Sequence, residues 1–188
     1  MEEKPNMKNK SVHRIALCAL IAAVYAALTM ALSFMSYGGV QFRIAEALCV
    51  LPYFFPFTSW GLFVGCLIAN LISPVGILDI VFGSLTTLAA CWCTAWFGKK
   101  NRERWGRCIG GALMPVVWNA VVIGLLLAVT AVDPAENSAP RWVFFLTFAG
   151  EVGFGELVVM FVLGLPLMRW LPKSRWYGDL SAALDNGR

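Results

Sequence analysis

The chain has 188 residues, of which 59% are hydrophobic and only 14% are charged, and its mean hydropathy is +0.70. A soluble domain has about 25% charged residues, so this composition excludes an ordinary soluble fold and indicates a polytopic membrane protein. The net charge of +4 comes from local clusters of basic residues and therefore informs membrane topology more than it indicates an acidic partner.

The apolar sequence is long enough for six helical crossings of about 20 residues each. The first apolar stretch is longer than a signal-peptide core and has no small-residue cleavage site after it, so we expect a retained helix. Turn sequences rich in Gly, Pro and Ser separate the later stretches. The second and third helices are short, which leaves tilted or partly re-entrant helices open. The expected helices cover residues 14–35, 41–55, 60–72, 78–97, 108–132 and 142–171.

The basic residues predict the orientation of these helices. With the amino terminus in the cytoplasm, six crossings place every Lys and Arg on the cytoplasmic side except Arg43 and Arg141, as the positive-inside rule requires. A count of five or seven helices would put either the cluster at 99–107 or one terminus on the wrong side. Tryptophans near the expected helix ends are typical of interface anchors: Trp60, Trp105, Trp142, Trp170 and Trp176.

The predicted fold class is therefore an all-α integral membrane protein of six transmembrane helices with both termini cytoplasmic. Residues 1–188 form a single domain in the cell membrane, and residues 1–10 and 174–188 are expected to be polar cytoplasmic tails.

Motifs for catalysis and for cofactor binding are missing from the sequence. It contains no GxxxxGK[ST], GxSxG or HExxH pattern, and its one histidine, His13, lies outside the expected spans. The six cysteines lie in or beside apolar segments without a CxxC pair, so we interpret them as small buried hydrophobic residues. The sequence predicts no enzyme, no metal site and no cofactor.

Polar residues inside the apolar helices are the candidate site. A charged side chain at the bilayer centre costs about 2.5–3.5 kcal/mol on insertion scales, so it is normally paired, lines a cavity or binds a ligand. The expected topology places these residues in the outer half of the bundle, as in a pocket open to the outside. They are the acids Glu46, Asp79, Glu151 and Glu156 and the amides Asn70 and Asn119.

Several of these residues have a purely structural alternative. Arg43 and Glu46 are three residues apart and can pair with each other on one helix, and Asp79 can cap the helix that follows it. Glu151 and Glu156 are about 140° apart on an ideal helix, so only one of them can face a given ligand. Trp118 and Tyr37 can stack on an aromatic ligand or simply pack.

The first helix carries alanines at a spacing of four residues. Small residues at this spacing let another helix approach closely. The stripe therefore serves either packing within the bundle or docking onto a different protein. It consists of Ala19, Ala23 and Ala27 together with Ala22 and Ala26.

Three blocks of sequence resemble the QueT family of substrate-binding (S) components of energy-coupling-factor importers. They run from Tyr37 to Pro52, from Gly61 to Leu71 and from Leu78 to Ala90, and the stretches at 155–157 and 164–167 are similar too. The resemblance implies a six-helix subunit that captures a queuosine precursor, a 7-deazaguanine, from outside. It also implies docking, through the alanine stripe of the first helix, onto a membrane scaffold subunit that carries two ATPase subunits.

A deazaguanine suits the candidate residues chemically. Its N1–H and exocyclic amine are parallel donors that a carboxylate can accept together, and a protonated aminomethyl group favours a second carboxylate or a ring face. We expect Glu46, Asp79 and one of the two helix-six glutamates to accept hydrogen bonds, while Arg43, Gln41, Asn70 and Asn119 orient the ligand.

Three other functions are open at this point. An autonomous proton-coupled transporter would use Glu151 or Glu156 to carry the proton. An intramembrane enzyme would use paired carboxylates, and a structural assembly subunit would bind no small molecule. The buried acids argue against the last of these.

Overall fold

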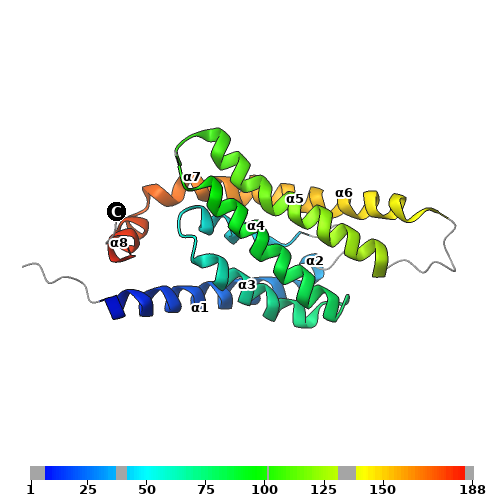
Figure 1. The fold of residues 1–188 in the computed structure, drawn as a ribbon, viewed down its shortest axis with the longest axis horizontal. Coiled ribbons are helices and arrows are strands. Elements are labelled where there is room, and N and C mark those ends of the chain that lie inside the picture. Colours follow the sequence, from blue (N-terminus) through cyan, green and yellow to red (C-terminus); the bar gives the residue numbers. More distant parts are fainter. Residues whose placement is uncertain (1–6, 37–41, 101, 131–138, 185–188) are drawn as a thin grey trace, which may run out of the picture.

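The structure is a computed structural model that describes residues 7–36, 42–100, 102–130 and 139–184 (Figure 1). This part of the chain contains helices and no strands. Four helices are long and apolar enough to cross a membrane, and two shorter apolar helices lie between the first two of them. The all-helical fold is confirmed and is consistent with a membrane protein, and the count of six crossings and the orientation of the termini stay predictions. The long helices cover Lys10–Ala31, Asp79–Phe97, Trp105–Thr130 and Arg141–Lys173, and the short ones Ile44–Tyr53 and Thr58–Ile72.

Apart from the start of the first helix, the helices begin and end within a few residues of the predicted bounds, but four of the predicted spans are irregular, and the second is entirely a 3-10 helix. The third span ends in a 3-10 turn, the fourth begins with a π-helical segment, and the sixth contains another. In chain order the elements are α1 (Met7–Ala31), α2 (Ser33–Ser36), η1 (Ile44–Tyr53), α3 (Thr58–Ala69), η2 (Asn70–Ile72), η3 (Asp79–Gly83), α4 (Ser84–Phe97), α5 (Trp105–Thr130), α6 (Arg141–Val159), η4 (Met160–Gly164), α7 (Leu165–Trp170), η5 (Leu171–Lys173) and α8 (Arg175–Leu184).

Residues 175–184, inside the segment expected to be a polar cytoplasmic tail, form the short helix α8. Tyr177 on α8 packs its ring against the rings of Phe54 and Phe55, with both centroid distances 5.5 Å. Leu180 of the same helix also packs against the core, so the helix depends on tertiary packing. At the other terminus, α1 starts at Met7, inside the expected tail.

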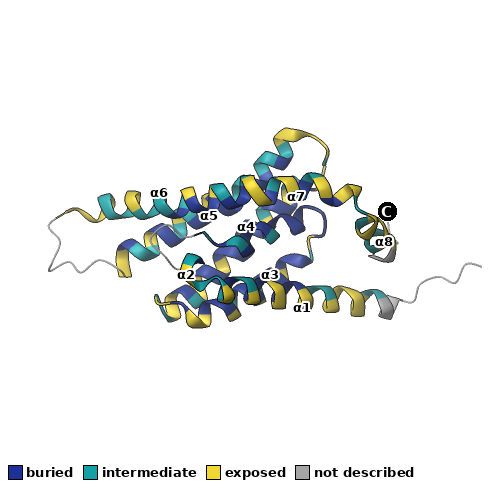
Figure 2. Cartoon of the chain, turned by 180° about the vertical axis from the view of Figure 1, so that it is seen from behind, coloured by how far each residue is buried: buried dark blue, intermediate teal, exposed yellow. Residues whose placement is uncertain are grey.

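The centre of the bundle is η1, a 3-10 helix of ten residues. Most of its side chains are buried, and it packs against α1 and against α3 to α7. Figure 2 shows that buried residues are concentrated between the helices. A 3-10 helix rises about 2 Å per residue, so η1 is about 20 Å long, whereas an α-helix of the same length would reach about 15 Å. The extended form lets a short segment cover much of the bundle while the helices around it shield its backbone from lipid.

Glycines allow two helix pairs to pack with their backbones close together. A Cβ added at Gly61 would lie 2.6 Å from the backbone oxygen of Cys18, and one at Gly65 would lie 2.8 Å from that of Ala22. These two glycines, four residues apart on α3, form a small-residue surface against α1 of the kind that packs membrane helices. Gly124 of α5 meets Ala149 of α6 in the same way.

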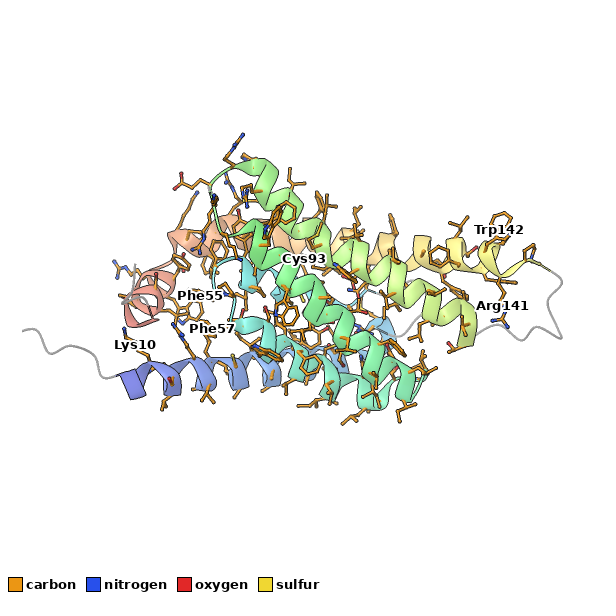
Figure 3. The ribbon with its side chains drawn as sticks, viewed as in Figure 1. Lys10, Phe55, Phe57, Cys93, Arg141 and Trp142 are labelled. Atoms are coloured by element: carbon orange, nitrogen blue, oxygen red, sulfur yellow. The ribbon has the colours of Figure 1, made fainter. Side chains whose placement is uncertain are left out.

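The bundle has two chemically different ends. One end brings together the start of α1, the η1–α3 turn, the end of α4 and α8, because Arg14, Phe57, Lys99 and Tyr177 line a common cavity there. Figure 3 shows Lys10, Phe55 and Phe57 at this end and Arg141 with Trp142 at the opposite one. The basic residues therefore separate along the long axis as the sequence predicted. The five expected anchor tryptophans are all exposed, as side chains at a membrane interface would be.

Candidate functional site

Six polar side chains that the sequence singled out are buried, and we call them the polar cluster. They come from η1 and its N-terminal neighbour, from η2, from η3, and from α5 and α6. None is more than 4% exposed, although three of them are acids and one is an arginine. Full burial of charged side chains is rare unless they are paired or functional. The members are Arg43, Glu46, Asn70, Asp79, Asn119 and Glu156.

Glu46 lies in the first turn of η1 and is held by neighbours on two elements. The hydroxyl of Tyr25, from α1, donates a hydrogen bond to Oε1 of Glu46. The thiol of Cys49, three residues along η1, donates to Oε2 over 2.9 Å. The Arg43 guanidinium, just before η1, interacts electrostatically with both Glu46 and Asp79. The pairing of Arg43 with Glu46 is thus part of a larger charge arrangement.

Asn70 and Asp79 meet across the turn that joins α3 to α4. Asn70 donates from Nδ2 to the backbone oxygen of Asp79 over 3.0 Å, and Ser73 Oγ donates to Asp79 Oδ2 over 2.5 Å. Asp79 opens the π-helical segment η3, and such segments often mark functional sites. Gly83 closes it, and a Cβ there would lie 2.6 Å from Asp79 Oδ1 and 2.7 Å from Asn70 Nδ2. The glycine therefore makes room for these two side chains.

Glu156 and Asn119 join the cluster from the other side of the bundle. Asn119 donates from Nδ2 to Oε1 of Glu156 over 3.3 Å, which links α5 to α6. Glu156 also interacts electrostatically with Glu46 and Arg43. Through Arg43 the three acids therefore form one electrostatic unit, in which a single buried cation faces three carboxyl groups among the described residues.

The polar cluster contains buried acceptor atoms that lack a hydrogen-bond partner among the described residues. They are Asn70 Oδ1, Asp79 Oδ1 and Glu156 Oε2. A buried acceptor without a partner loses about 1–3 kcal/mol relative to a satisfied one, and such atoms in a native protein call for an explanation. Three acceptors from three elements indicate a site for a ligand that is rich in N–H donors.

The remaining predicted site residues lie outside the polar cluster or outside the described residues. Glu151 is half-buried and lies outside the cluster, so Glu156 is the helix-six glutamate that faces it. Trp118 is 36% exposed on the outer surface, whereas its neighbour Asn119 points inward. The stacking role predicted for Trp118 therefore has no support from its position. Gln41 and Tyr37 lie outside the described residues.

Three side chains of the site were missed by the sequence analysis: Tyr25, Cys49 and Ser73. Ser73 precedes a proline in an evident turn, and this is the one signal that could have suggested it. Tyr25 lies in an alanine-rich helix, and the partner of its hydroxyl is 21 residues away. Only the packing of α1 against η1 brings the two together.

The alanine stripe of α1 divides into two faces. Ala22 and Ala26 are each 6% exposed and lie within the bundle, where Ala22 meets Gly65 of α3. For these two alanines, packing within the bundle is the observed role. Ala19, Ala23 and Ala27 are exposed.

The fold and the buried charges define a multi-pass, all-helical membrane protein. The chain belongs to the QueT transporter family, whose model matches residues 15–173. One similar protein is "Queuosine precursor transporter QueT" of Lactococcus lactis subsp. cremoris (strain MG1363), which is 37% identical over 84 residues. That alignment covers 44% of this chain and 49% of the relative, so the chain matches about half the length of that protein. No solved structure matches the chain.

Proposed function

We propose that this chain is the membrane-embedded substrate-binding subunit of an ATP-driven importer and that its substrate is a queuosine precursor, a 7-deazaguanine. Membership of the QueT transporter family supports the transport role, and the name of the Lactococcus relative supports the substrate class. The observation that carries the proposal is the set of three buried acceptor atoms without partners, beside one buried arginine.

The donor pattern of a deazaguanine complements these atoms. Its N1–H and exocyclic amine supply parallel donors for the carboxylate of Asp79 or Glu156. Its ring carbonyl oxygen can accept from the Arg43 guanidinium, and Asn70 and Asn119 orient the ring. A protonated aminomethyl substituent would be stabilised by the remaining carboxylate. Guanine lacks the substituent at position 7, so the polar cluster can discriminate against it.

The proposed topology has six crossings in the cytoplasmic membrane, with both termini and the Lys- and Arg-rich end in the cytoplasm. The positive-inside rule supports this orientation, and so does the separation of Lys10 from Arg141 along the bundle (Figure 3). The substrate then reaches the polar cluster from the outside.

Energy for import comes, in this proposal, from partner subunits. The chain has no phosphate-binding loop of the GxxxxGK[ST] type. The exposed face of α1 with Ala19, Ala23 and Ala27 is smooth enough for a helix of a scaffold subunit to pack on it. That scaffold would carry two ATPase subunits.

The binding test is calorimetry on the purified chain with 7-cyano- and 7-aminomethyl-7-deazaguanine, queuine, guanine and an unrelated vitamin. We expect a Kd below about 1 μM for at least one deazaguanine and much weaker binding of guanine. The variants Glu46→Gln, Asp79→Asn and Glu156→Gln should each weaken binding about 10-fold or more, because hydrogen bonds to charged groups contribute about 1.5–3 kcal/mol. Glu151→Gln is the matched control and should bind as the parent does. Failure of the whole panel to bind would remove the proposed substrate.

The partner test uses the same chain in proteoliposomes. Uptake should require the scaffold and ATPase subunits with ATP, and collapse of the proton gradient should leave it unchanged. Ala23→Leu should abolish copurification with the scaffold while ligand binding stays intact. Ala182→Leu, at an exposed alanine of α8, is the control. Uptake by the chain alone, driven by a proton gradient, would contradict the proposal.

A further inference from the structure

A second polar site lies at the end of the bundle that carries Arg14, Lys99 and Arg102, which we call the basic end. Its polar side chains are cations, whereas those of the polar cluster are mostly acids and amides. A cavity of about 240 Å³ opens there between α1, the η1–α3 turn, the end of α4 and α8. Three cations line it, Arg14, Lys99 and Arg102, together with aromatic rings that include Phe55 and Tyr177. No carboxylate is among the lining residues in the part of the chain that the structure describes. The cavity therefore attracts an anion.

Two of the three cations are held in place by contacts within the chain. The guanidinium of Arg14 lies over the ring of Phe57, 5.5 Å from its centroid, and such a contact fixes an arginine while its N–H groups remain able to donate. Arg102 donates from Nε to the backbone oxygen of Gly98 over 2.6 Å. Its other nitrogens belong to the same planar fork, which suits bidentate contact with phosphate oxygens.

An apolar groove continues from this cavity along α1. The groove has a volume of about 150 Å³, and Phe55 lines both it and the cavity. Leu17, Leu20 and Val24 form its α1 wall, and Trp176 of α8 stands beside its neighbour Tyr177, which lines the cavity. From Arg14 to Val24 the helix rises about 15 Å. This distance is half of the hydrocarbon thickness of about 30 Å, or the depth of one leaflet.

We propose that Arg14, Lys99 and Arg102 bind the phosphate group of an anionic phospholipid whose acyl chain lies in the groove along Leu17, Leu20 and Val24. The basic cavity and the apolar groove adjoin each other at Phe55, which favours a lipid over free phosphate. A soluble anion would fill the cavity but not the groove. An anionic headgroup is favoured over a zwitterionic one because three cations without a carboxylate would repel a choline group. The proposal rests on the proposed topology, which puts this end at the cytoplasmic surface, and it is independent of the transported substrate.

The test is quenching of Trp176 fluorescence by lipids with brominated acyl chains, with the full-length protein in nanodiscs. The contribution of Trp176 is the difference between the parent and Trp176→Phe, because the chain has eight tryptophans. Brominated phosphatidylglycerol should quench this contribution at a several-fold lower mole fraction than brominated phosphatidylcholine. The double variant Arg14→Gln/Lys99→Gln should lose most of that preference, since each basic side chain near an anionic surface contributes about fivefold.

The matched control is Lys100→Gln/Arg104→Gln, which removes the same charge from exposed positions that do not line the cavity. It should keep the preference of the parent. Equal quenching by the two lipids in the parent protein would overturn the proposal, and so would an equal loss of preference in both double variants. Millimolar glycerol 1-phosphate should not reverse the quenching. Reversal would identify a site for soluble phosphate and would overturn the lipid assignment.

Discussion

Arginine has different roles in the polar cluster and at the basic end. Arg43 is 4% exposed and neutralises buried carboxyl groups. At the basic end, Arg107 donates from Nε to the backbone oxygen of Phe97 over 2.7 Å, and Arg102 donates to that of Gly98. These two oxygens belong to the end of α4, where helix carbonyls lack intrahelical partners and favour cations. The arginines there stabilise a helix end, while Arg43 makes a charged interior possible.

The two regions also differ in solvent access and in whether their polar atoms have hydrogen-bond partners. The polar cluster is closed and has acceptor atoms without partners. The basic end is open, with cavities of about 240 Å³ and 650 Å³ that share Phe54, Arg102 and Tyr177. A buried group without a partner lowers stability and is retained where a ligand supplies the partner. We therefore propose that the cluster determines substrate specificity and that the basic end determines membrane topology.

Replacement of the buried arginine should have the largest effect. Arg43→Gln leaves three carboxyl groups without their cation, so the free energy of unfolding should fall by about 3–5 kcal/mol. Arg107→Gln removes one hydrogen bond to a carbonyl and should cost about 1 kcal/mol. Denaturant titration of the detergent-solubilised variants measures both. Similar losses at the two positions would show that Arg43 does not neutralise the cluster.

Removal of the Glu156 carboxyl group should affect stability and ligand binding in opposite directions. Glu156→Met keeps the size of the side chain and eliminates the acceptor that lacks a partner. The ligand-free protein should become more stable by up to about 1–3 kcal/mol, because an acceptor without a partner is removed, and the loss of the hydrogen bond from Asn119 offsets part of this gain. Binding of the deazaguanine should weaken about 10-fold or more in calorimetry. A loss of stability would mean that Glu156 is a structural member of the bundle.

A methyl group placed inside the cluster should have an intermediate effect. Gly83→Ala puts a Cβ within 2.7 Å of polar atoms of both Asp79 and Asn70, and overpacking of this kind costs about 1–3 kcal/mol. Ligand affinity should fall because the two side chains must move. Gly106→Ala is the matched control at the basic end, where a Cβ meets nothing within 4 Å. Thermal unfolding and calorimetry on the pair compare the regions directly.

The sequence predicted the helices well because membrane insertion leaves its mark on local composition. Hydropathy located the long apolar helices, and the basic residues predicted which connections share an end. It did not predict α8, because the segment from Arg175 is short and mixes polar with apolar residues, and the helix packs on the core through Tyr177 and Leu180. A helix that is stabilised by residues distant in the chain need not show a helical pattern in its own sequence.

The site was predictable to the level of residue type but not of arrangement. Helix geometry required that only one of Glu151 and Glu156 face a ligand, but the choice depends on which face of α6 packs inward. That face is formed by Val152, Gly155 and Val159, and Glu156 shares it. Tyr25 was missed because its role comes from a contact across the bundle, whereas Ser73 was missed although its contact with Asp79 lies within one turn.

Two tyrosine hydroxyls provide the finest comparison of the two regions. Tyr25 donates to the carboxyl group of Glu46 in the cluster, whereas Tyr53 donates to the backbone oxygen of Arg102 over 2.8 Å at the basic end. Hydrogen bonds to charged groups contribute about 1.5–3 kcal/mol and neutral ones about 0.5–1.5 kcal/mol. Tyr25→Phe should therefore lower the free energy of unfolding by more than Tyr53→Phe does.

The two tyrosine variants should also differ in their affinity for the ligand. Tyr25→Phe frees one oxygen of Glu46, so its affinity for the deazaguanine should change several-fold, while that of Tyr53→Phe should equal the affinity of the parent. Both variants keep the aromatic ring, so packing is matched between them. Calorimetry and denaturant titration on the two proteins measure the effects. If Tyr53→Phe altered the affinity as much as Tyr25→Phe, the two regions would be coupled, and the division between specificity and topology would not hold.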